Sequence, residues 1–144
     1  MPVGATAPDF EAREPDGTAT RLSGASGSPR VVYFYPKDET PGCTKEACAF
    51  RDAFDRYREK GIVIFGVSRD SAESHREFQQ HHALPFALAA DESGVVQKAY
   101  GVPSKLGHAA RVTFLVGRDG RVVRVFPDVD PAVHANEVLA AAER

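Results

Sequence analysis

Runs of apolar residues recur along the 144-residue chain with two spacings, one typical of strands and one typical of helices. Five runs rich in β-branched and aromatic residues predict strands: 31–35, 62–68, 86–90, 111–116 and 121–126. Four further stretches predict helices: 43–60, 71–82, 94–100 and 132–143. A turn at 117–120, with a glycine at each end, links the last two strands and is typical of a hairpin.

The predicted strands and helices alternate after an extended N-terminal region. Such alternation implies βαβ units with parallel strands, and the closing hairpin makes the sheet mixed. No internal repeat, low-complexity tract or long linker divides the chain. We therefore expect a single α/β domain over residues 1–144, with a mixed central sheet flanked by helices.

The predicted helix 43–60 holds both cysteines of the chain, at different angles around its axis. At about 100° per residue, an apolar stripe lies within about 40° of Cys43. Its other members are Ala47, Phe50, Phe54 and Tyr57. Cys48 lies about 140° away, on a charged face. A buried structural cysteine belongs on the stripe, so Cys48 does not fit that role, whereas Cys43 could be an inert core residue on position alone.

Two features argue against an inert Cys43. It stands at the predicted start of the helix, where free N–H groups and the helix dipole stabilise an anion, and the thiolate is the reactive form of cysteine. It also follows Thr40, Pro41 and Gly42. Gly42 has no side chain to block an approaching molecule, and the Thr40 hydroxyl, one turn away, can donate or accept a hydrogen bond. Thr40 could equally serve as the N-cap of the helix.

The spacing of the two cysteines limits how they can react with each other. Five residues along an ideal helix separate two Cα atoms by roughly 8–9 Å, whereas a disulfide needs roughly 4.4–6.8 Å. If both lie on one helix, a Cys43–Cys48 disulfide requires the first turns to unwind. The spacing also differs from the Cys-x-x-Cys of dithiol oxidoreductases, and two cysteines without a nearby histidine make a poor zinc motif.

Composition and charge exclude several function classes. The formal net charge of −2 gives no electrostatic basis for binding nucleic acid or an anionic membrane. No apolar run is long enough to span a bilayer, and the first ten residues lack the features of a signal peptide. Two cysteines are too few for a disulfide scaffold, and such a pair in a reducing compartment is typical of catalysis, redox sensing or metal binding. We expect a cytoplasmic protein.

The residues around Cys43 resemble the active-site segment of the peroxiredoxins. Pro36, Thr40 and Cys43 fit the family pattern Pro-x-x-x-Thr-x-x-Cys. Cys48, five residues further on, fits the bacterioferritin comigratory, or Q-type, subfamily. Other matches extend the resemblance over most of the chain: Gly4, Ala7, Pro8 and Phe10 at its start, the segment 100–102, and the strand 111–116.

This resemblance implies a thioredoxin-like fold and a thiol peroxidase that reduces hydrogen peroxide and organic hydroperoxides without metal or haem. Cys43 would be the peroxidatic cysteine, and Cys48 would resolve its sulfenic acid as an intramolecular disulfide. Thioredoxin or a similar dithiol would then reduce that disulfide. A resolving cysteine within the same chain needs no partner chain, so we expect a monomer.

The resemblance also implies roles for four other residues. Thr40 would hydrogen-bond the thiolate and the peroxide, and Arg111 would stabilise the thiolate and polarise the O–O bond. Pro36 would shield the pocket from water. Backbone N–H groups around Gly42 and Cys43 would hold the peroxide oxygens. Without the resemblance, Arg111 would be interpreted as a solvated residue at the start of a strand.

Other interpretations stay open. A general thiol–disulfide oxidoreductase on the same fold would reduce insulin, which a peroxidase should not do. A non-catalytic redox switch would form one disulfide per molecule and show no turnover with a reductant. Glu46 is expected to complement the helix dipole rather than act as a base, and His81 and His82 are expected to be surface residues rather than ligands.

Overall fold

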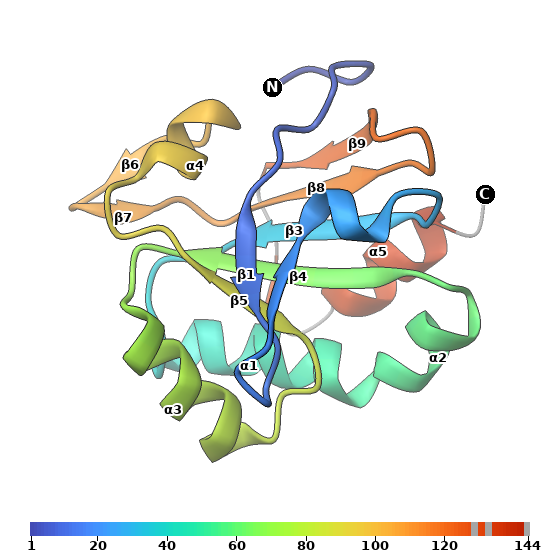
Figure 1. The fold of residues 1–144 in the computed structure, drawn as a ribbon. Helices are drawn as coiled ribbons and strands as arrows, with labels where there is room; N and C mark the ends of the chain where they lie inside the picture. Colours follow the sequence, from blue (N-terminus) through green and yellow to red (C-terminus); the bar gives the residue numbers. More distant parts are fainter. Residues whose placement is uncertain (128–129, 132–133, 143–144) are drawn as a thin grey trace.

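The computed structural model describes residues 1–127, 130–131 and 134–142 and shows a mixed sheet with helices on its faces (Figure 1). The sheet has seven strands in the order β2-β1-β5-β4-β3-β8-β9. Their bounds are β1 Glu11–Arg13, β2 Ala19–Arg21, β3 Arg30–Phe34, β4 Val63–Ser68, β5 Ala87–Ala90, β8 Val112–Val116 and β9 Val122–Phe126. Strand β4 is parallel to both β3 and β5, and the other pairs are antiparallel. The predicted α/β class with a mixed sheet is confirmed.

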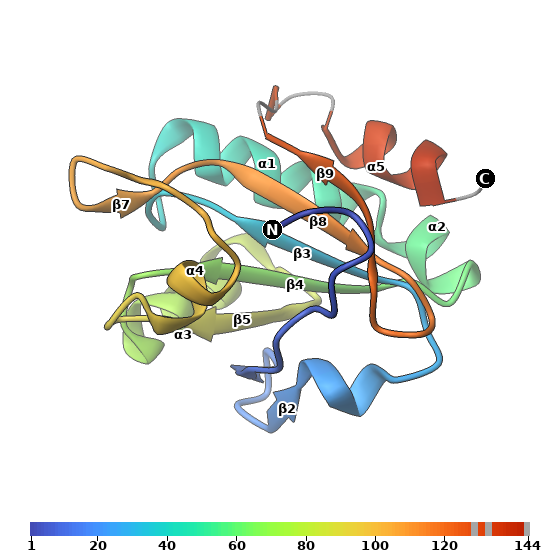
Figure 2. The same ribbon diagram turned by 90° about the horizontal axis from the view of Figure 1, so that it is seen from above.

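The helices are α1 Pro41–Asp52, α2 Phe54–Glu59, α3 Ala72–His82, α4 Val95–Ala99 and α5 His134–Ala142, with a short 3₁₀ turn, η1, at Leu22–Ala25. In Figure 1, α1, α2 and α3 lie below the sheet and α4 lies above it. Seen from above in Figure 2, α5 lies beside the α1–α2 segment. Within the described part of the chain, no helix has both the length and the apolar character needed to cross a membrane.

The alternation of side chains along β3 explains why both faces of the sheet are covered. Val31, Tyr33 and, just after the strand, Tyr35 belong to the apolar cluster between the sheet and the helices α1, α2, α3 and α5. Val32 and Phe34 point the other way, into a second cluster that includes the N-terminal segment and the chain after α4. Successive strand residues face opposite sides, so a strand that is apolar at every position after Arg30 must be covered on both. Strand β3 is therefore buried on both faces, between β4 and β8.

Two regions hold more strand structure than the pattern predicts. The extended N-terminal region forms the β1–β2 hairpin, and β1 joins the sheet beside β5. The segment after α4 contains a second, two-stranded sheet of β6 (Ser104–Lys105) and β7 (His108–Ala109). At the C-terminal end, the described residues 134–142 are helical as expected, and 132, 133 and 143 lie outside the described residues.

The prediction of one helix over 43–60 is wrong in two respects. The helix begins at Pro41, where the missing N–H of proline costs nothing because no acceptor exists in the first turn. It is also interrupted at Ala53, which separates α1 from α2. No glycine or proline marks this break. It accompanies the burial of Tyr57, whose hydroxyl donates to the Ala135 carbonyl of α5.

Candidate active site

Cys43 is the third residue of α1, and the local sequence places it there. Thr40 has the extended backbone of an N-cap residue, with φ −75° and ψ 151°, and Pro41 occupies the first helical position. The N–H groups of Gly42 and Cys43 lie in the first turn, which offers no acceptor within the helix. They are available to an anion at this end. The Cys43 side chain is a free thiol and only 1% exposed.

Arg111 reaches Cys43 because of how the sheet is paired. Strand β8 runs antiparallel to β3 with Val112 opposite Phe34, so Arg111 lies where the chain leaves β3 toward α1. The guanidinium Nη2 donates to the Cys43 Sγ at 3.4 Å. A side chain on Gly42 would place its Cβ 3.1 Å from the same nitrogen. Glycine at this position therefore lets the cation approach the start of the helix.

Glu46 completes this group and differs from its sequence-based interpretation. Its side chain is fully buried, and its Oε1 accepts a hydrogen bond from Arg111 Nη1 at 2.7 Å. The other oxygen, Oε2, has no hydrogen-bond partner among the described residues. Burial raises the pKa of Glu46 to about 7, although Arg111 acts to lower it. Glu46 therefore orients the guanidinium and does more than complement the helix dipole.

Glu46→Gln is expected to change how the free energy of unfolding depends on pH. The carboxyl has an ordinary pKa of 4.5 and a pKa of about 7 in the folded protein, so between these values the folded state keeps a proton that the unfolded chain loses. The stabilisation is complete below about pH 4.5 and is lost as the pH rises through about 7, by ~3 kcal/mol. Denaturant unfolding over this range should show the loss in the wild type relative to Glu46→Gln, whose amide does not titrate.

The matched control for this prediction is Glu59→Gln, because Glu59 is exposed at the end of α2. Its pH profile should parallel that of the wild type. If the wild type and Glu46→Gln lose stability equally between about pH 4.5 and about pH 8, the raised pKa of Glu46 is contradicted.

Thr40 and Pro36 lie on the loop between β3 and α1. Thr40 is the N-cap residue of α1 by its backbone, but its side chain accepts no hydrogen bond from the helix N–H groups. The Thr40 hydroxyl donates to the Lys37 carbonyl at 2.7 Å. Because its proton is used in this bond, the hydroxyl oxygen can act toward a ligand as an acceptor. Pro36 is half-buried two residues after the end of β3. Thus the structure places Thr40 at the start of the helix that carries Cys43, but with its proton bonded to Lys37.

Cys48 lies on α1 with Cys43, as the sequence predicts, and α1 runs unbroken through both. It is half-buried and carries a free thiol. The roughly 8–9 Å between Cα atoms five residues apart on a helix exceeds the reach of a disulfide. The two thiols therefore cannot bond in this conformation, and a disulfide between them would require the start of α1 to unwind.

A buried polar network, which was not predicted from the sequence, holds the loop before α1. Asp38 Oδ1 accepts from the Tyr35 hydroxyl at 2.6 Å, and its Oδ2 lies 2.7 Å from His75 Nδ1 and accepts from Ser74 at 2.8 Å. The Asp38 N–H donates to Asp70. Because His75 and Ser74 belong to α3, the network fastens this loop to that helix. No local pattern indicates this network, since Asp38 lies more than 30 residues from its partners Asp70, Ser74 and His75.

His134 is a second buried group that the sequence did not reveal. It lies on α5, and its Nε2 is 2.7 Å from the Thr113 hydroxyl of β8. Its ring packs edge-on against Phe50 of α1 and Phe126 of β9. Burial lowers the pKa of His134, although Glu137 acts to raise it. His134 therefore contacts both α1, which carries Cys43, and β8, which begins directly after Arg111.

Among the residues that the structure describes, two groups of side chains have the ligand atoms for a metal ion: Asp38, Asp70 and His75, and Glu39, His81 and His82. In the first group the donor atoms are committed to the buried network described above. The second group is at the surface. Neither group includes Cys43, Arg111 or Glu46.

Comparisons with known sequences all match proteins of one family. The sequence profile of the AhpC/TSA family matches residues 3–125. The chain is 44% identical over 139 residues to "Peroxiredoxin Q, chloroplastic" from Oryza sativa subsp. japonica, which covers 94% of this chain and 64% of that protein. The chain thus spans slightly less than two thirds of that relative. It is 39% identical over 144 residues to "Putative peroxiredoxin bcp" from Coxiella burnetii, with 95% of each covered.

Solved structures give the same result for the fold. A cysteine-to-serine mutant of PrxQ from Xylella fastidiosa is 30% identical and superposes with a TM-score of 0.91, covering 99% of this chain and 96% of that one. Peroxidoxin BcpB from Mycobacterium tuberculosis is 34% identical with a TM-score of 0.89, covering 99% of this chain and 97% of that one. The thioredoxin-like fold expected from the sequence is therefore confirmed.

Proposed function

Because the chain belongs to the AhpC/TSA family, as a peroxiredoxin of the Q or bacterioferritin comigratory type, we propose that it is a thiol peroxidase whose nucleophile is Cys43. One observation carries the proposal: the Arg111 guanidinium donates to the Cys43 sulfur at the N-terminal end of α1. A cation and a helix N-terminus both favour the thiolate, which is the nucleophilic form.

In the first step, the Cys43 thiolate attacks one oxygen of a hydroperoxide. An S–O bond forms, the O–O bond breaks, and the leaving oxygen takes a proton to become water or an alcohol. Cys43 is oxidised to a sulfenic acid. Arg111 and the first-turn N–H groups lie where negative charge develops, and donors fixed toward such charge are usually the largest catalytic contribution. The Thr40 oxygen accepts a hydrogen bond from the peroxide O–H.

In the second step, the Cys48 thiol condenses with the sulfenic acid and releases water, which leaves a Cys43–Cys48 disulfide. The first turns of α1 unwind to bring the two sulfurs together. The half-buried position of Cys48 supports this role, because its thiol is not locked in the apolar core. A dithiol such as thioredoxin then reduces the disulfide. We propose hydrogen peroxide and small organic hydroperoxides as substrates, and a monomer as the working state.

Replacing Arg111 tests the geometry that carries this proposal. Arg111→Gln is expected to lower the rate constant of the first attack by about 10²–10³-fold, the usual effect of removing one fixed donor from developing charge. The measurement is stopped-flow consumption of hydrogen peroxide by the reduced protein, with circular dichroism to check the fold. Arg118→Gln is the matched control, because Arg118 lies in the turn after β8, bonded to the Gly27 carbonyl. A wild-type rate in Arg111→Gln would contradict the proposed role.

A further inference from the structure

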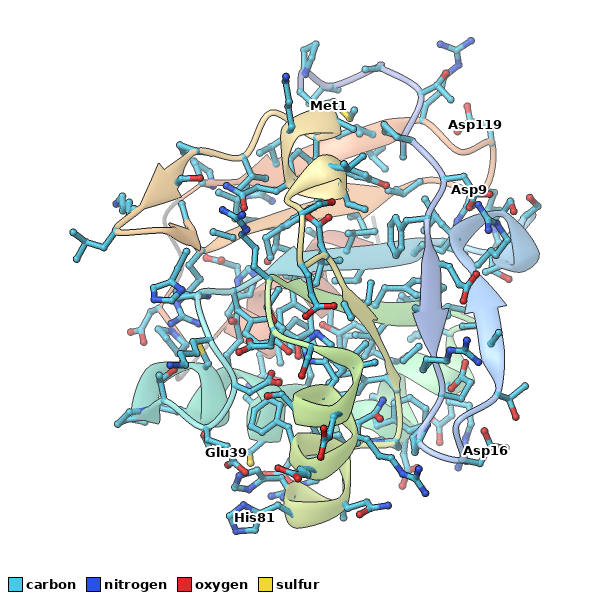
Figure 3. The ribbon with its side chains drawn as sticks, turned by 60° about the vertical axis from the view of Figure 1, so that its left-hand side comes forward. Met1, Asp9, Asp16, Glu39, His81 and Asp119 are labelled. Atoms are coloured by element: carbon cyan, nitrogen blue, oxygen red, sulfur yellow. The ribbon has the colours of Figure 1, made fainter. Side chains whose placement is uncertain are left out.

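Two consecutive histidines at the end of α3 turn toward one carboxylate on the loop that leads to Cys43. Glu39 Oε2 lies 2.8 Å from His81 Nδ1, and Glu39 Oε1 lies 2.7 Å from His82 Nε2. One ligand atom from each of the three side chains falls within 4.8 Å of the others. Figure 3 shows Glu39 and His81 side by side where the loop meets the end of α3. Three side chains with metal-ligand atoms thus converge from two separate segments.

The backbone holds two of these three residues in place. Glu39 has φ 63°, a left-handed conformation that is unfavourable for a residue other than glycine and persists only when its surroundings impose it. Its neighbour Asp38 is anchored in the buried network. The His82 ring packs edge-on against Phe78, and its carbonyl accepts from Arg51 of α1. The convergence on Glu39 is therefore built into the fold.

The donor set has the chemistry of a zinc site. Two imidazoles and one carboxylate are a known ligand set for Zn²⁺, which completes its tetrahedron with water. Metal–ligand bonds of about 2.0–2.1 Å place the donors of a tetrahedral site about 3.3 Å apart. In the structure Glu39 Oε2 and Oε1 lie 2.8 and 2.7 Å from the two histidine nitrogens, and one ligand atom from each side chain lies within 4.8 Å of the others, so small side-chain movements would bring them to this spacing. The His81 side chain is 66% exposed, so it can make such a movement. The exposed side of the site leaves a coordination position for water.

We propose that Glu39, His81 and His82 form a binding site for a zinc-class divalent transition-metal ion, which clamps the active-site loop to α3. This assigns His81 and His82 as ligands, whereas the sequence suggested only surface residues. The Asp38, Asp70 and His75 group is the weaker candidate, because Asp38 and His75 are buried and all three side chains bond neighbours outside the group, Tyr35, Ser68 and the Ala89 carbonyl.

The position of Glu39 links the site to the reaction, a consequence that rests on the proposed function. Glu39 directly precedes Thr40, the N-cap of α1. Formation of the Cys43–Cys48 disulfide requires the first turns of α1 to unwind. An ion that ties Glu39 to α3 restrains the chain at the start of that helix. Bound metal therefore slows disulfide formation, while the first attack, which needs no unwinding, keeps its rate.

Binding is tested by calorimetric titration of the Cys43→Ser, Cys48→Ser double variant with zinc chloride, because thiolates would otherwise bind the ion. We expect one ion per chain and no saturable heat from magnesium chloride, since Mg²⁺ prefers oxygen ligands. Glu39→Gln and His81→Ala should each weaken zinc affinity at least about tenfold, because even loss of an outer-shell partner costs about 10–100-fold. His108→Ala, a histidine of β7, is the matched control and should bind as the parent does.

Two results would overturn the site: no saturable zinc binding, or equal affinity in the parent, Glu39→Gln and His81→Ala. The clamp is tested with the cysteines intact, by comparing disulfide formation with and without zinc in the wild type and in Glu39→Gln. Zinc should slow disulfide formation more in the wild type than in Glu39→Gln, because zinc binding to the thiolates acts on both proteins alike, and equal slowing in both would contradict the clamp. If neither protein consumes peroxide without zinc, the proposed peroxidase function fails, while the calorimetric result still decides the metal site.

Discussion

Cys43→Ser is expected to abolish peroxide consumption, lowering the rate constant by at least about 10⁴-fold, as loss of a catalytic nucleophile does in other enzymes. A serine hydroxyl stays protonated at neutral pH and cannot use the positive environment that Arg111 and the start of α1 provide for a thiolate. Serine is slightly smaller than cysteine, so the buried position should tolerate it. Stopped-flow measurement with reduced protein and excess hydrogen peroxide, beside a circular dichroism spectrum, gives the result.

Lys45→Ser is the matched control for this variant, because Lys45 is exposed on the same helix two residues away. Its rate should equal that of the wild type. Rapid consumption by a folded Cys43→Ser protein would show that Cys48 or another group attacks the peroxide. Slow consumption by the wild type, no faster than a free thiol, would favour the non-catalytic redox switch.

Cys48→Ser is expected to separate the two steps of the reaction. The first attack should keep its rate and consume one equivalent of peroxide, because Arg111, Glu46 and the first-turn N–H groups are unchanged. Steady-state turnover with thioredoxin should fall to background, since the sulfenic acid has no thiol to condense with and excess peroxide oxidises it further to a sulfinic acid. A coupled assay with thioredoxin and its reductase measures turnover, and mass spectrometry identifies the oxidised form of Cys43.

Ala49→Ser is the control for this variant, because it introduces the same hydroxyl at the neighbouring half-buried position of α1. Turnover in that protein should match the wild type. Wild-type turnover in Cys48→Ser would mean that the reductant attacks the sulfenic acid directly, and Cys48 would then have no resolving role.

The pattern of apolar residues was sufficient for the strands β3, β4, β5, β8 and β9 and for the face that α1 buries, but not for β1 and β2. The strand predicted at 62–68 is β4 within one residue, because a run apolar at nearly every position has one stable environment, the centre of a covered sheet. The stripe through Cys43, Ala47, Phe50 and Tyr57 is buried as predicted, since helical periodicity is a local property. Phe54 is only partly buried, because the helix breaks at Ala53 immediately before it.

Features that depend on distant partners could not be predicted in the same way. Glu46 lies about 60° from Cys43 around the helix, close enough to the stripe to be buried, but its burial depends on Arg111, which is distant in sequence. Asp38 and His75 pair across the loop and α3, and neither carries a local pattern. The resemblance to a known family identified Cys43 and Arg111, whereas Glu46 and the buried network came from the structure alone.

The measurement that most directly tests the account is mapping of the thiols after the reduced wild type reacts with one equivalent of hydrogen peroxide. Trypsin cleaves after Lys45, between the two cysteines, so an intramolecular disulfide joins peptides 38–45 and 46–51. The account predicts this linked pair, no thiol left to alkylate, and an intact chain of monomer mass that is lighter by two hydrogen atoms. A disulfide-linked dimer, or a Cys43 sulfinic acid beside a free Cys48, would contradict it.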